Sequence, residues 1–437
     1  MIKRGLGLFL LAVLWPVAAT AFSDLPAGPL TWRLGGYFKS FAAMTQGAGA
    51  YEAAGLTERE TFWNDASRFR ARSSLFLGET LELGVNYELF GLVGDDQRLR
   101  RRGEEKYGGN PFGEQILAQL FPVVTTPELL GLEHSIDETD DYRLSHRLDR
   151  LYLKLHAGPW DFTLGRAALT WGPGRIWNPT DYLASFSPTE IDKEEKIGVD
   201  LAHARVAVTD AVTVEAFAAP VRQGDDRVDG EHSAAAGRVA WRLLAAEWAF
   251  SGGWLYDRAK AGFEVDGQLF DAGWRGAITR TTVAGVPGKV YYQAIANADY
   301  AWGVAWNPYL AGEYFYNGFG RDDPDEYADL ATEPAFQRAA ARGELYNVGR
   351  HYLGVIFTVQ PHALVTVGNT AIVNLTDGSG YEGPVVTWSV LRDLDWLFGA
   401  QLTFGRVPSE YGGQINPFGG EELTVPESYY SYLKYYF

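Results

Sequence analysis

Segments in which apolar and polar residues alternate recur along the chain from residue 31 to residue 437, and this period-two pattern limits the possible fold more than any other feature. The clearest segment is 81–90, where large apolar residues at odd positions alternate with mostly polar residues. Successive side chains of a strand point to opposite faces, so one face of such a segment suits lipid and the other suits water. Each segment has about 9 to 13 residues, the length of a membrane-spanning strand.

Only the N-terminus contains a long apolar stretch. Lys3 and Arg4 precede apolar residues at 6–17, and Ala19 and Ala21 fit a small-x-small cleavage site. This order predicts a cleaved secretory signal peptide and export through the periplasm. A transmembrane anchor is the alternative, but the stretch is shorter than the roughly 20 residues that a spanning helix needs. If the mature chain crosses a membrane, it must do so with strands.

The alternating segments predict an all-β fold, a transmembrane antiparallel up-and-down β-barrel of about 18 strands, with 16 to 20 as the range. Residues 1–21 are the predicted signal peptide, and residues 22–437 are predicted to form a single barrel. Eighteen is an even number, as single-chain bacterial barrels require. The predicted strands are 31–43, 66–77, 79–92, 142–157, 159–167, 197–208, 211–219, 236–245, 247–257, 259–269, 272–282, 289–299, 308–317, 350–359, 362–374, 383–391, 396–405 and 428–437.

The lengths of the connections support this assignment. Bacterial barrels have short periplasmic turns and longer extracellular loops. With the first strand running outward, the short links all fall on the periplasmic side, near Gly78, Gly158, Asp210, Ala246, Asp271, 301–307, Gln360 and Asp393. The long links fall on the extracellular side, at 44–65, 93–141, 168–196, 220–235, 318–349 and 406–427.

The C-terminal segment carries a separate signal. Phe437 ends the chain, and Tyr435 and Leu433 lie on the same face of the predicted strand. The segment resembles the C-terminal strand of Gram-negative outer-membrane barrels, in which a terminal Phe and alternating aromatic residues form the assembly signal. The resemblance implies a place in the cell outer membrane, contact with its lipid and lipopolysaccharide, and recognition by the barrel-insertion machinery. Pairing of this strand with the first would remove unpaired edges from the bilayer.

Composition excludes several classes of function. The absence of Cys excludes disulfides, thiolate metal sites and covalently attached haem. The net charge of −17 at pH 7 argues against nucleic acid as a partner. The 7 His are scattered, without a G-x-S-x-G motif or a His pair at helical spacing. The sequence therefore predicts a protein that is not an enzyme and has no cofactor or metal site.

The most distinctive run, residues 165–181, follows the fifth predicted strand and is rich in Gly, Pro, Trp and Asn. Such a composition predicts tight turns that are ordered by aromatic packing. The run resembles the G-R-x-x-x-x-W-G stretch and following N-P-x-D turn of alginate-export porins. The resemblance implies that this segment folds inward and narrows the pore. The residues predicted to shape this constriction are Gly165, Arg166, Trp171, Gly172, Trp177, Asn178, Pro179 and Asp181.

Arg166 departs from the simple pattern. Strict alternation places it on the same face as Phe162 and Leu164, which should contact lipid. Either Gly165 forms a bulge that turns Arg166 inward, or the lipid-facing band ends at this position.

The inner face of the early strands is predicted to be charged. Charges that face lipid near the bilayer midplane cost about 2 to 4 kcal/mol each, so alternating charges on a strand must point into the lumen. Two interpretations stay open: a basic strip that attracts anionic solutes, or an Arg/Glu ladder that braces the wall. The predicted pore-lining residues are Arg68, Arg70, Arg72, Glu82, Glu88, Arg150, Lys154 and Arg175.

The sequence thus favours an outer-membrane channel for the diffusion of small hydrophilic, possibly anionic, solutes. The alternative is a barrel that sheathes a multihaem c-type cytochrome in a transmembrane electron conduit, where the partner would supply all the haem. Self-association into a trimer is a further option. The transported solute, the ion selectivity and the state of the lumen are not encoded in any motif of the chain.

Overall fold

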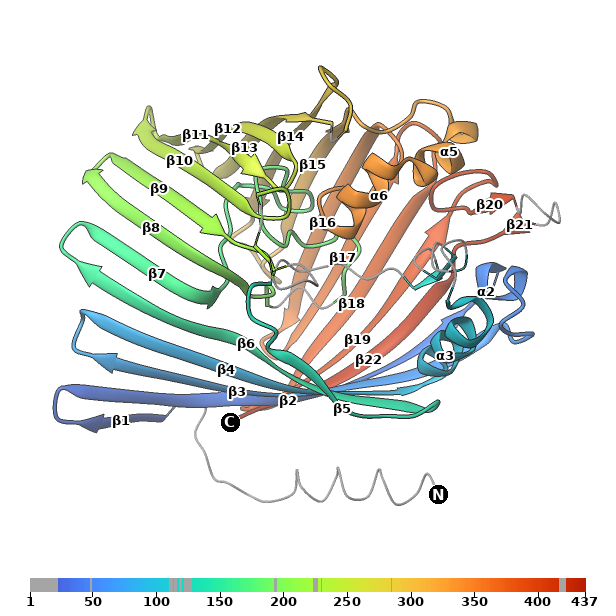
Figure 1. The fold of residues 1–437 in the computed structure, drawn as a ribbon, viewed down its shortest axis with the longest axis horizontal. Coiled ribbons are helices and arrows are strands. Elements are labelled where there is room, and N and C mark those ends of the chain that lie inside the picture. The colour runs from blue at the N-terminus through green and yellow to red at the C-terminus, as the bar shows by residue number, and fades with distance from the viewer. Residues whose placement is uncertain are drawn as a thin grey trace.

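The computed structural model describes residues 23–47, 49–109, 113, 116–117, 120–121, 128–191, 195–222, 227–228, 230–283, 285–415 and 422–437. Within them, one sheet of twenty antiparallel strands wraps into a barrel (Figure 1). Eighteen strands close the ring, which confirms the predicted fold and strand number. They are β2 (Leu30–Gln46), β3 (Thr61–Leu77), β4 (Leu81–Gly94), β6 (Tyr142–Ala157), β7 (Trp160–Ala167), β8 (Val199–Thr209), β9 (Val212–Ala219), β10 (Ala234–Leu243), β11 (Ala246–Leu255), β12 (Arg258–Leu269), β13 (Ala272–Thr282), β14 (Val290–Ala301), β15 (Tyr309–Asn317), β16 (His351–His362), β17 (Val365–Asn374), β18 (Gly380–Leu391), β19 (Leu394–Phe404) and β22 (Glu427–Tyr436).

Two short strands extend this ring. β1 (Ser23–Ala27) pairs with the start of β2, below the point where β22 ends. β5 (Glu133–Glu138) pairs with the outer half of β6, on the edge that the short strand β7 leaves open. A separate pair, β20 (Gln414–Ile415) and β21 (Glu422–Leu423), lies in the loop before β22.

The ring closes between the last strand and the first. β22 pairs with β2 over ten residue pairs, from Tyr37↔Tyr436 to Gln46↔Glu427. The backbone of Phe437 exchanges two hydrogen bonds with Gly36, of 2.9 and 3.1 Å, and its ring stacks on Phe69 at 5.6 Å. A Cβ at Gly36 would lie 2.7 Å from the Phe437 ring, so a glycine there lets the terminal ring lie flat on the wall. The assembly role of this terminus stays a prediction.

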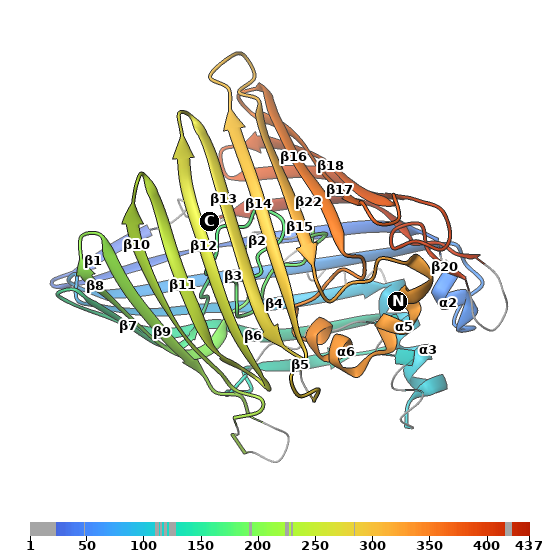
Figure 2. The ribbon, with the colours of Figure 1, turned by 90° about the horizontal axis from the view of Figure 1, so that it is seen from above.

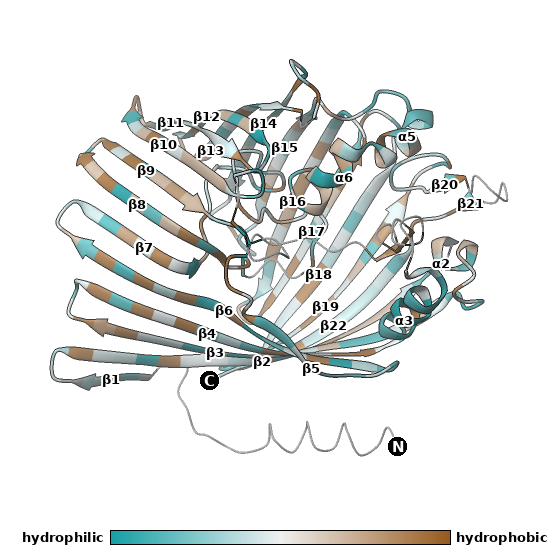
Figure 3. Ribbon diagram, in the orientation of Figure 1, coloured by the Kyte–Doolittle hydropathy of each residue, from teal (hydrophilic) through white to brown (hydrophobic). Residues whose placement is uncertain are grey.

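The alternation of the sequence appears as bands of opposite hydropathy along the strands (Figure 3). Leu433 and Tyr435 belong to the outward face, where they are 41% and 42% exposed, whereas the intervening Lys434 is 4% exposed. Outward apolar side chains without a protein partner are stable only against lipid, so this exposure is expected for a membrane barrel. None of the helices in the described residues is long and apolar enough to span a bilayer.

Turns and loops gather at opposite ends of the barrel. The helices and the β20–β21 pair lie together at one end in both views, and the tight turns lie at the other (Figures 1 and 2). These helices are α2 (Gly49–Ala53), α3 (Asp95–Tyr107), the 3-10 turn η1 (Pro324–Glu326), α5 (Tyr327–Thr332) and α6 (Pro334–Ala341). The long connections therefore gather at one end of the barrel, although the two-residue link between β11 and β12, Tyr256 and Asp257, lies at this end as well. The predicted signal peptide, residues 1–21, lies outside the described residues.

Candidate functional site

The described residues of the connection between β7 and β8, 168–191 and 195–198, do not extend away from the barrel but lie within the outline of the ring in both views (Figures 1 and 2). The connection starts on the fifth strand of the ring and reaches β15, the thirteenth, which lies across the lumen. In the described part of the chain it also contacts β3, β11 and β19. We call residues 168–198 the constriction segment.

A single carboxylate on the far wall holds the tip of the constriction segment. Glu313 of β15 is 1% exposed and accepts hydrogen bonds from three consecutive backbone amides, at 2.8, 3.0 and 2.7 Å. These amides belong to Arg175, Ile176 and Trp177, and Asn297 of β14 donates a fourth bond of 2.8 Å. Successive N–H groups that point to one place form an anion-binding nest, and here the anion is a side chain of the barrel.

Aromatic side chains of the segment pack on both walls. Trp171 packs against Phe217 of β9 with ring centroids 5.1 Å apart, within a buried cluster on β8–β11. Trp177 stacks on Phe315 of β15 at 5.2 Å and donates a 2.8 Å hydrogen bond to Asn347 in the loop before β16. The two tryptophans thus fix the run on opposite walls, and its role in narrowing the pore stays a prediction.

The Gly, Asn, Pro and Asp residues of the motif shape the turn between these two tryptophans. Gly172 has a φ of 86°, and a Cβ there would lie 2.1 Å from the side-chain oxygen of Asn178. The Asn178 amide donates to the carbonyl of Trp171 at 2.8 Å, and Pro179 is buried beside it. Asp181 accepts two hydrogen bonds from the ammonium of Lys196, at 2.5 and 2.7 Å, which ties the two halves of the segment together.

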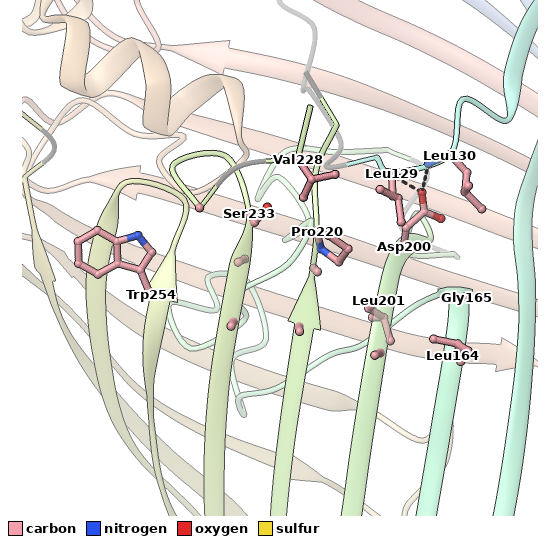
Figure 4. Close-up of a pocket in the computed structure, with 16 residues that line it drawn as sticks. Leu129, Leu130, Leu164, Gly165, Asp200, Leu201, Pro220, Val228, Ser233 and Trp254 are labelled. Atoms are coloured by element: carbon pink, nitrogen blue, oxygen red, sulfur yellow. Dashed lines mark hydrogen bonds between the residues drawn. The ribbon is translucent and has the colours of Figure 1, made fainter. Parts of the chain in front are cut away.

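Arg166 does not turn inward, so the bulge interpretation is wrong. β7 pairs with β6 and β8 without a register shift, although Gly165 has a φ of 116°. Arg166 forms two hydrogen bonds with Asp200 of β8, at 2.9 and 2.8 Å, and a third with the carbonyl of Leu130. The backbone amides of Leu129 and Leu130 donate to the same Asp200 carboxylate (Figure 4). The lipid-facing band ends here because a neutralised, covered ion pair takes the next outward position.

Arg70 is the centre of a buried ion-pair network inside the lumen. Its guanidinium is 1% exposed and contacts Glu88 at 2.5 Å, Asp149 at 2.6 Å and Glu195 at 2.6 Å. Arg150 shares Asp149 at 2.6 Å. The network joins β3, β4 and β6 to the constriction segment, so it supports the ladder interpretation for these residues.

Asp149 and Glu195 were not among the predicted pore residues. Asp149 lies at a register shift between β4 and β6, which turns an acid of outward parity into the lumen. Strict alternation cannot find such a residue. Glu195 belongs to the constriction segment, where no strand period applies, and only its position in an acidic run could have suggested a contact with a basic strand.

Basic side chains also face the lumen on the two closing strands, β2 and β22. Lys434 of β22 lies 4.2 Å from the ring centre of Tyr37, and Lys39 of β2 lies 5.1 Å from that of Tyr432. Arg72 lies over Tyr37 at 5.6 Å and also pairs with Glu195. These lysines were missed because each is a single charge in an aromatic strand, but their inward parity was readable.

The other predicted pore residues lie at different places in the lumen. Arg68 borders the same strip on β3, opposite Lys39. Arg175 is 41% exposed at its side chain and contacts Asp299 at 3.3 Å on the far wall. Arg175 thus lies across the lumen from the β3 arginines Arg68, Arg70 and Arg72, so the predicted residues do not form one continuous row.

A cavity of about 150 Å³ lies against the base of the constriction segment. Its lining includes Arg150, Lys154 and His203 together with the Tyr152 ring. Lys154 contacts Glu82 at 3.8 Å, and the Tyr152 hydroxyl donates to the same carboxylate at 2.7 Å. The cavity brings three basic side chains to one face of a space that could hold a small solute.

A buried carboxyl links the extracellular loops to the constriction segment. Glu410, in the loop after β19, accepts hydrogen bonds from the Tyr352 hydroxyl at 2.5 Å and from the amides of Asn347 and Asn374 at 2.9 and 2.8 Å. Asn347 in turn accepts from Trp177. Burial, together with the nearby Asp377, raises the pKa of Glu410 to about 7, although the hydrogen bonds from Tyr352 and Asn347 act to lower it.

This arrangement predicts that the loop around residues 405–415 loosens as pH rises. Because the pKa of Glu410 is raised in the folded state from an ordinary 4.5, the stabilisation is complete below pH 4.5 and is lost as pH rises through about 7. The full effect is roughly 3 kcal/mol, from the 1.36 kcal/mol per pKa unit. Limited proteolysis at pH 5 and pH 8 should cut this loop faster at pH 8.

Glu410→Gln should remove this pH dependence, because the amide is neutral throughout. Glu422→Gln, at an exposed carboxylate of the same loop, is the matched control and should keep it. Equal cleavage rates for the unmodified protein at the two pH values would contradict the assignment.

Solved structures of known proteins share this architecture. The structure of OccAB3 from Acinetobacter baumannii matches with a TM-score of 0.51 and 9% sequence identity, over 93% of this chain and 99% of that one. The chain has the fold of the outer-membrane porins. OccK1 (OpdK) from Pseudomonas aeruginosa matches with a TM-score of 0.49 at 9% identity, over 93% and 98% of the two chains. OpdK from the same organism, solved with vanillate, matches with 0.48 at 10%, over 92% and 98%.

No protein-family profile and no curated protein matches this sequence. At such low identity the match to OccAB3 shows the fold alone. The resemblance of residues 165–181 to alginate-export porins stays a prediction.

Proposed function

We propose that this protein is an outer-membrane channel through which small hydrophilic solutes diffuse, with a preference for anions. The observation that carries the proposal is the constriction segment, which crosses the lumen and is anchored on Glu313 opposite a wall that bears cationic side chains. A segment held in this way narrows a pore without depending on a partner, and charge at the narrow point sets selectivity.

Cationic side chains that point into the lumen near the constriction segment favour anions over cations. Arg70 is neutralised by three carboxylates, so it stabilises the barrel wall and adds little to the electrostatic potential in the pore. Arg72 and Lys154 each pair with one carboxylate, Glu195 and Glu82, but remain 31% and 37% exposed at their side chains. Lys39 and Lys434 face tyrosine rings. Among the described lumen residues of β2, β3 and β22, cations thus outnumber carboxylates.

The cytochrome sheath receives no support from the lumen. Such a sheath needs a wide empty interior, whereas this interior holds the chain's own segment, packed on two walls through Trp171 and Trp177. The insertion machinery, lipopolysaccharide and a trimeric assembly stay predicted partners.

Single-channel recording in a planar bilayer tests the proposal. The protein should give stable open steps, and a KCl gradient should give a reversal potential that indicates chloride preference. Arg72→Gln and Lys154→Gln should each lower the chloride-to-potassium permeability ratio by about twofold to fivefold, because a unit charge at 4 Å in water is worth about 1 kcal/mol.

Lys289→Gln is the matched control, because this exposed lysine lies in the extracellular turn before β14 and away from the lumen. It should leave the permeability ratio unchanged. Cation preference in the unmodified protein would refute the anion part of the proposal, and absence of any conductance from correctly folded barrels would refute the channel itself.

A further inference from the structure

A cavity of about 730 Å³ lies against the outer face of the wall, at the loop end of β7–β11 (Figure 4). This volume falls within the range of about 300 to 1,000 Å³ that is usual for sites of small organic molecules. Its floor is a cross-strand row of outward side chains, in which alanines on β8, β9 and β10 lie between two large residues that are 63% and 53% exposed. The row is Leu164↔Ala202↔Ala218↔Ala235↔Trp254. The outer wall is therefore hollowed between Leu164 and Trp254.

The next outward row, toward the tight turns, is small as well. It runs Phe162↔Ala204↔Ala216↔Gly237↔Gly252. Neither glycine has a positive φ, and a Cβ built at either would meet no atom closer than 3.6 Å. Packing within the protein therefore does not require glycine at Gly237 or Gly252, and larger side chains would only fill the space outside the wall. We call the space over these two rows the outer hollow.

A third row bounds the outer hollow on the side of the tight turns. Its side chains are large, and it runs Trp160↔Val206↔Val214↔Val239↔Phe250. Phe250 and Trp254 are four residues apart on β11, which corresponds to about 13 Å along a strand. The hollow is thus long enough to hold a stretch of several methylene groups.

Loop residues close the outer hollow at its other end. They are Leu129, Leu130, Pro220 and Val228. Of the described residues that line the cavity, Asp200 alone is charged, and its carboxylate is already bound by Arg166 and by two backbone amides. Ser233 accepts a hydrogen bond of 3.1 Å from a backbone amide. The lining therefore suits an apolar occupant.

The position on the outer face decides what fills this space. Outward side chains of a membrane barrel face hydrocarbon, and an apolar cavity does not hold ordered water. The outer walls of two barrels are both convex, so a second copy of the chain would touch Leu164 and Trp254 before it reached the alanines between them. A flexible hydrocarbon chain meets no such obstacle.

We propose that the outer hollow binds an acyl chain of a lipid from the surrounding bilayer. The chain lies on the alanine and glycine rows, between Leu164 and Trp254, and its polar end lies toward the loops. The contact is held by dispersion, because hydrocarbon gains no hydrophobic energy on leaving the bilayer for the wall, and small residues let it approach the backbone closely. This inference rests on the membrane setting of the proposed channel and not on conduction.

Crystals of the full-length barrel test the proposal directly when they are grown from a lipid mesophase that contains phosphatidylethanolamine with brominated acyl chains. Bromine gives an anomalous peak, which should lie within about 4 to 4.5 Å of the Cβ of Ala218 or Ala235. Bromine peaks elsewhere on the outer wall, with none in the outer hollow, would overturn the proposal.

Native mass spectrometry of the barrel released from detergent gives the strength of binding. With phosphatidylethanolamine as the probe, the unmodified protein should retain one lipid molecule more tightly than any further ones. Ala218→Phe fills the middle of the alanine row and should weaken this retention by about tenfold, equivalent to roughly 1.4 kcal/mol. Gly237→Leu fills the next row and is a second variant with the same expected loss.

Ala296→Phe is the matched control, because Ala296 is an exposed outward alanine of β14, between Gly276 and Tyr314 on another part of the wall. It should retain the lipid as the unmodified protein does. Equal retention in all three variants, equal loss in all three, or a dimer in place of the lipid-bound monomer would each refute the assignment. A barrel that conducts ions but retains no lipid would refute this inference and leave the channel in place.

Discussion

Glu313→Ala should raise the single-channel conductance by at least about twofold, because conduction is limited by the narrowest part of a pore and this carboxylate holds the narrowing segment in place. The substitution removes the acceptor of three consecutive backbone amides and leaves those amides without a partner on the far wall. Hydrogen bonds to a charged group contribute about 1.5 to 3 kcal/mol each, so docking of the tip should weaken by roughly 4 kcal/mol or more.

The measurement is conductance in a planar bilayer, combined with proteolysis of the constriction segment. Glu313→Gln should give an intermediate result, because the amide oxygen accepts hydrogen bonds but carries no charge. Glu79→Gln, at an exposed carboxylate in the turn between β3 and β4, is the control and should behave as the unmodified protein. If conductance and proteolysis of Glu313→Ala match those of the control, the anchor is not what keeps the lumen narrow.

The strands could be predicted because the bilayer imposes a simple rule on each residue. A strand between lipid and water must alternate, so the period-two pattern revealed all eighteen strands of the ring, including the short strand β7. The irregular pieces of the wall could not be predicted. β5 pairs with the part of β6 that the short strand β7 does not reach. This change of partner along β6 has no counterpart in the period-two pattern of the sequence.

The site was predictable only where a residue's role depends on its own strand. Arg70 and Glu88 have inward parity, and their contact follows from adjacent strands. Glu313 has inward parity too, but its partners are backbone amides more than 130 positions away in the chain. Nearly every residue type has the same backbone amide, so no residue pattern in the sequence predicts this contact.

The outcome for Arg166 illustrates the same limit. Parity correctly placed this arginine outward, but no residue pattern predicts that Asp200 neutralises it and that the segment 128–130 contacts it. The alternation of a single strand predicts whether a side chain points outward or inward. Contacts with loops then decide whether an outward side chain is exposed to lipid or covered by protein.

Arg70→Met should be the most destabilising single substitution in the lumen wall. It removes the one guanidinium that contacts Glu88, Asp149 and Glu195 together. Each carboxylate keeps at least one other arginine partner, but the network loses its central charge. Removing one partner of a buried ion pair costs about 3 to 5 kcal/mol where the remaining charge is left uncompensated, so the arginines that remain in this network should keep the loss at the lower end of that range. Urea unfolding of the refolded barrel in detergent micelles, followed by tryptophan fluorescence, measures the loss.

Arg33→Met is the matched control, since Arg33 pairs with Asp24 at 2.8 Å but both side chains are about half exposed. An exposed pair contributes about 0 to 1 kcal/mol, so the control should change the unfolding free energy little. A double variant, Arg70→Met with Glu88→Gln, should recover part of the lost unfolding free energy, because the negative charge of Glu88 is removed together with its partner Arg70. If Arg70→Met unfolds like Arg33→Met and the second substitution recovers nothing, the network does not hold the constriction segment to the wall, and the inward arginines are free to act on solutes.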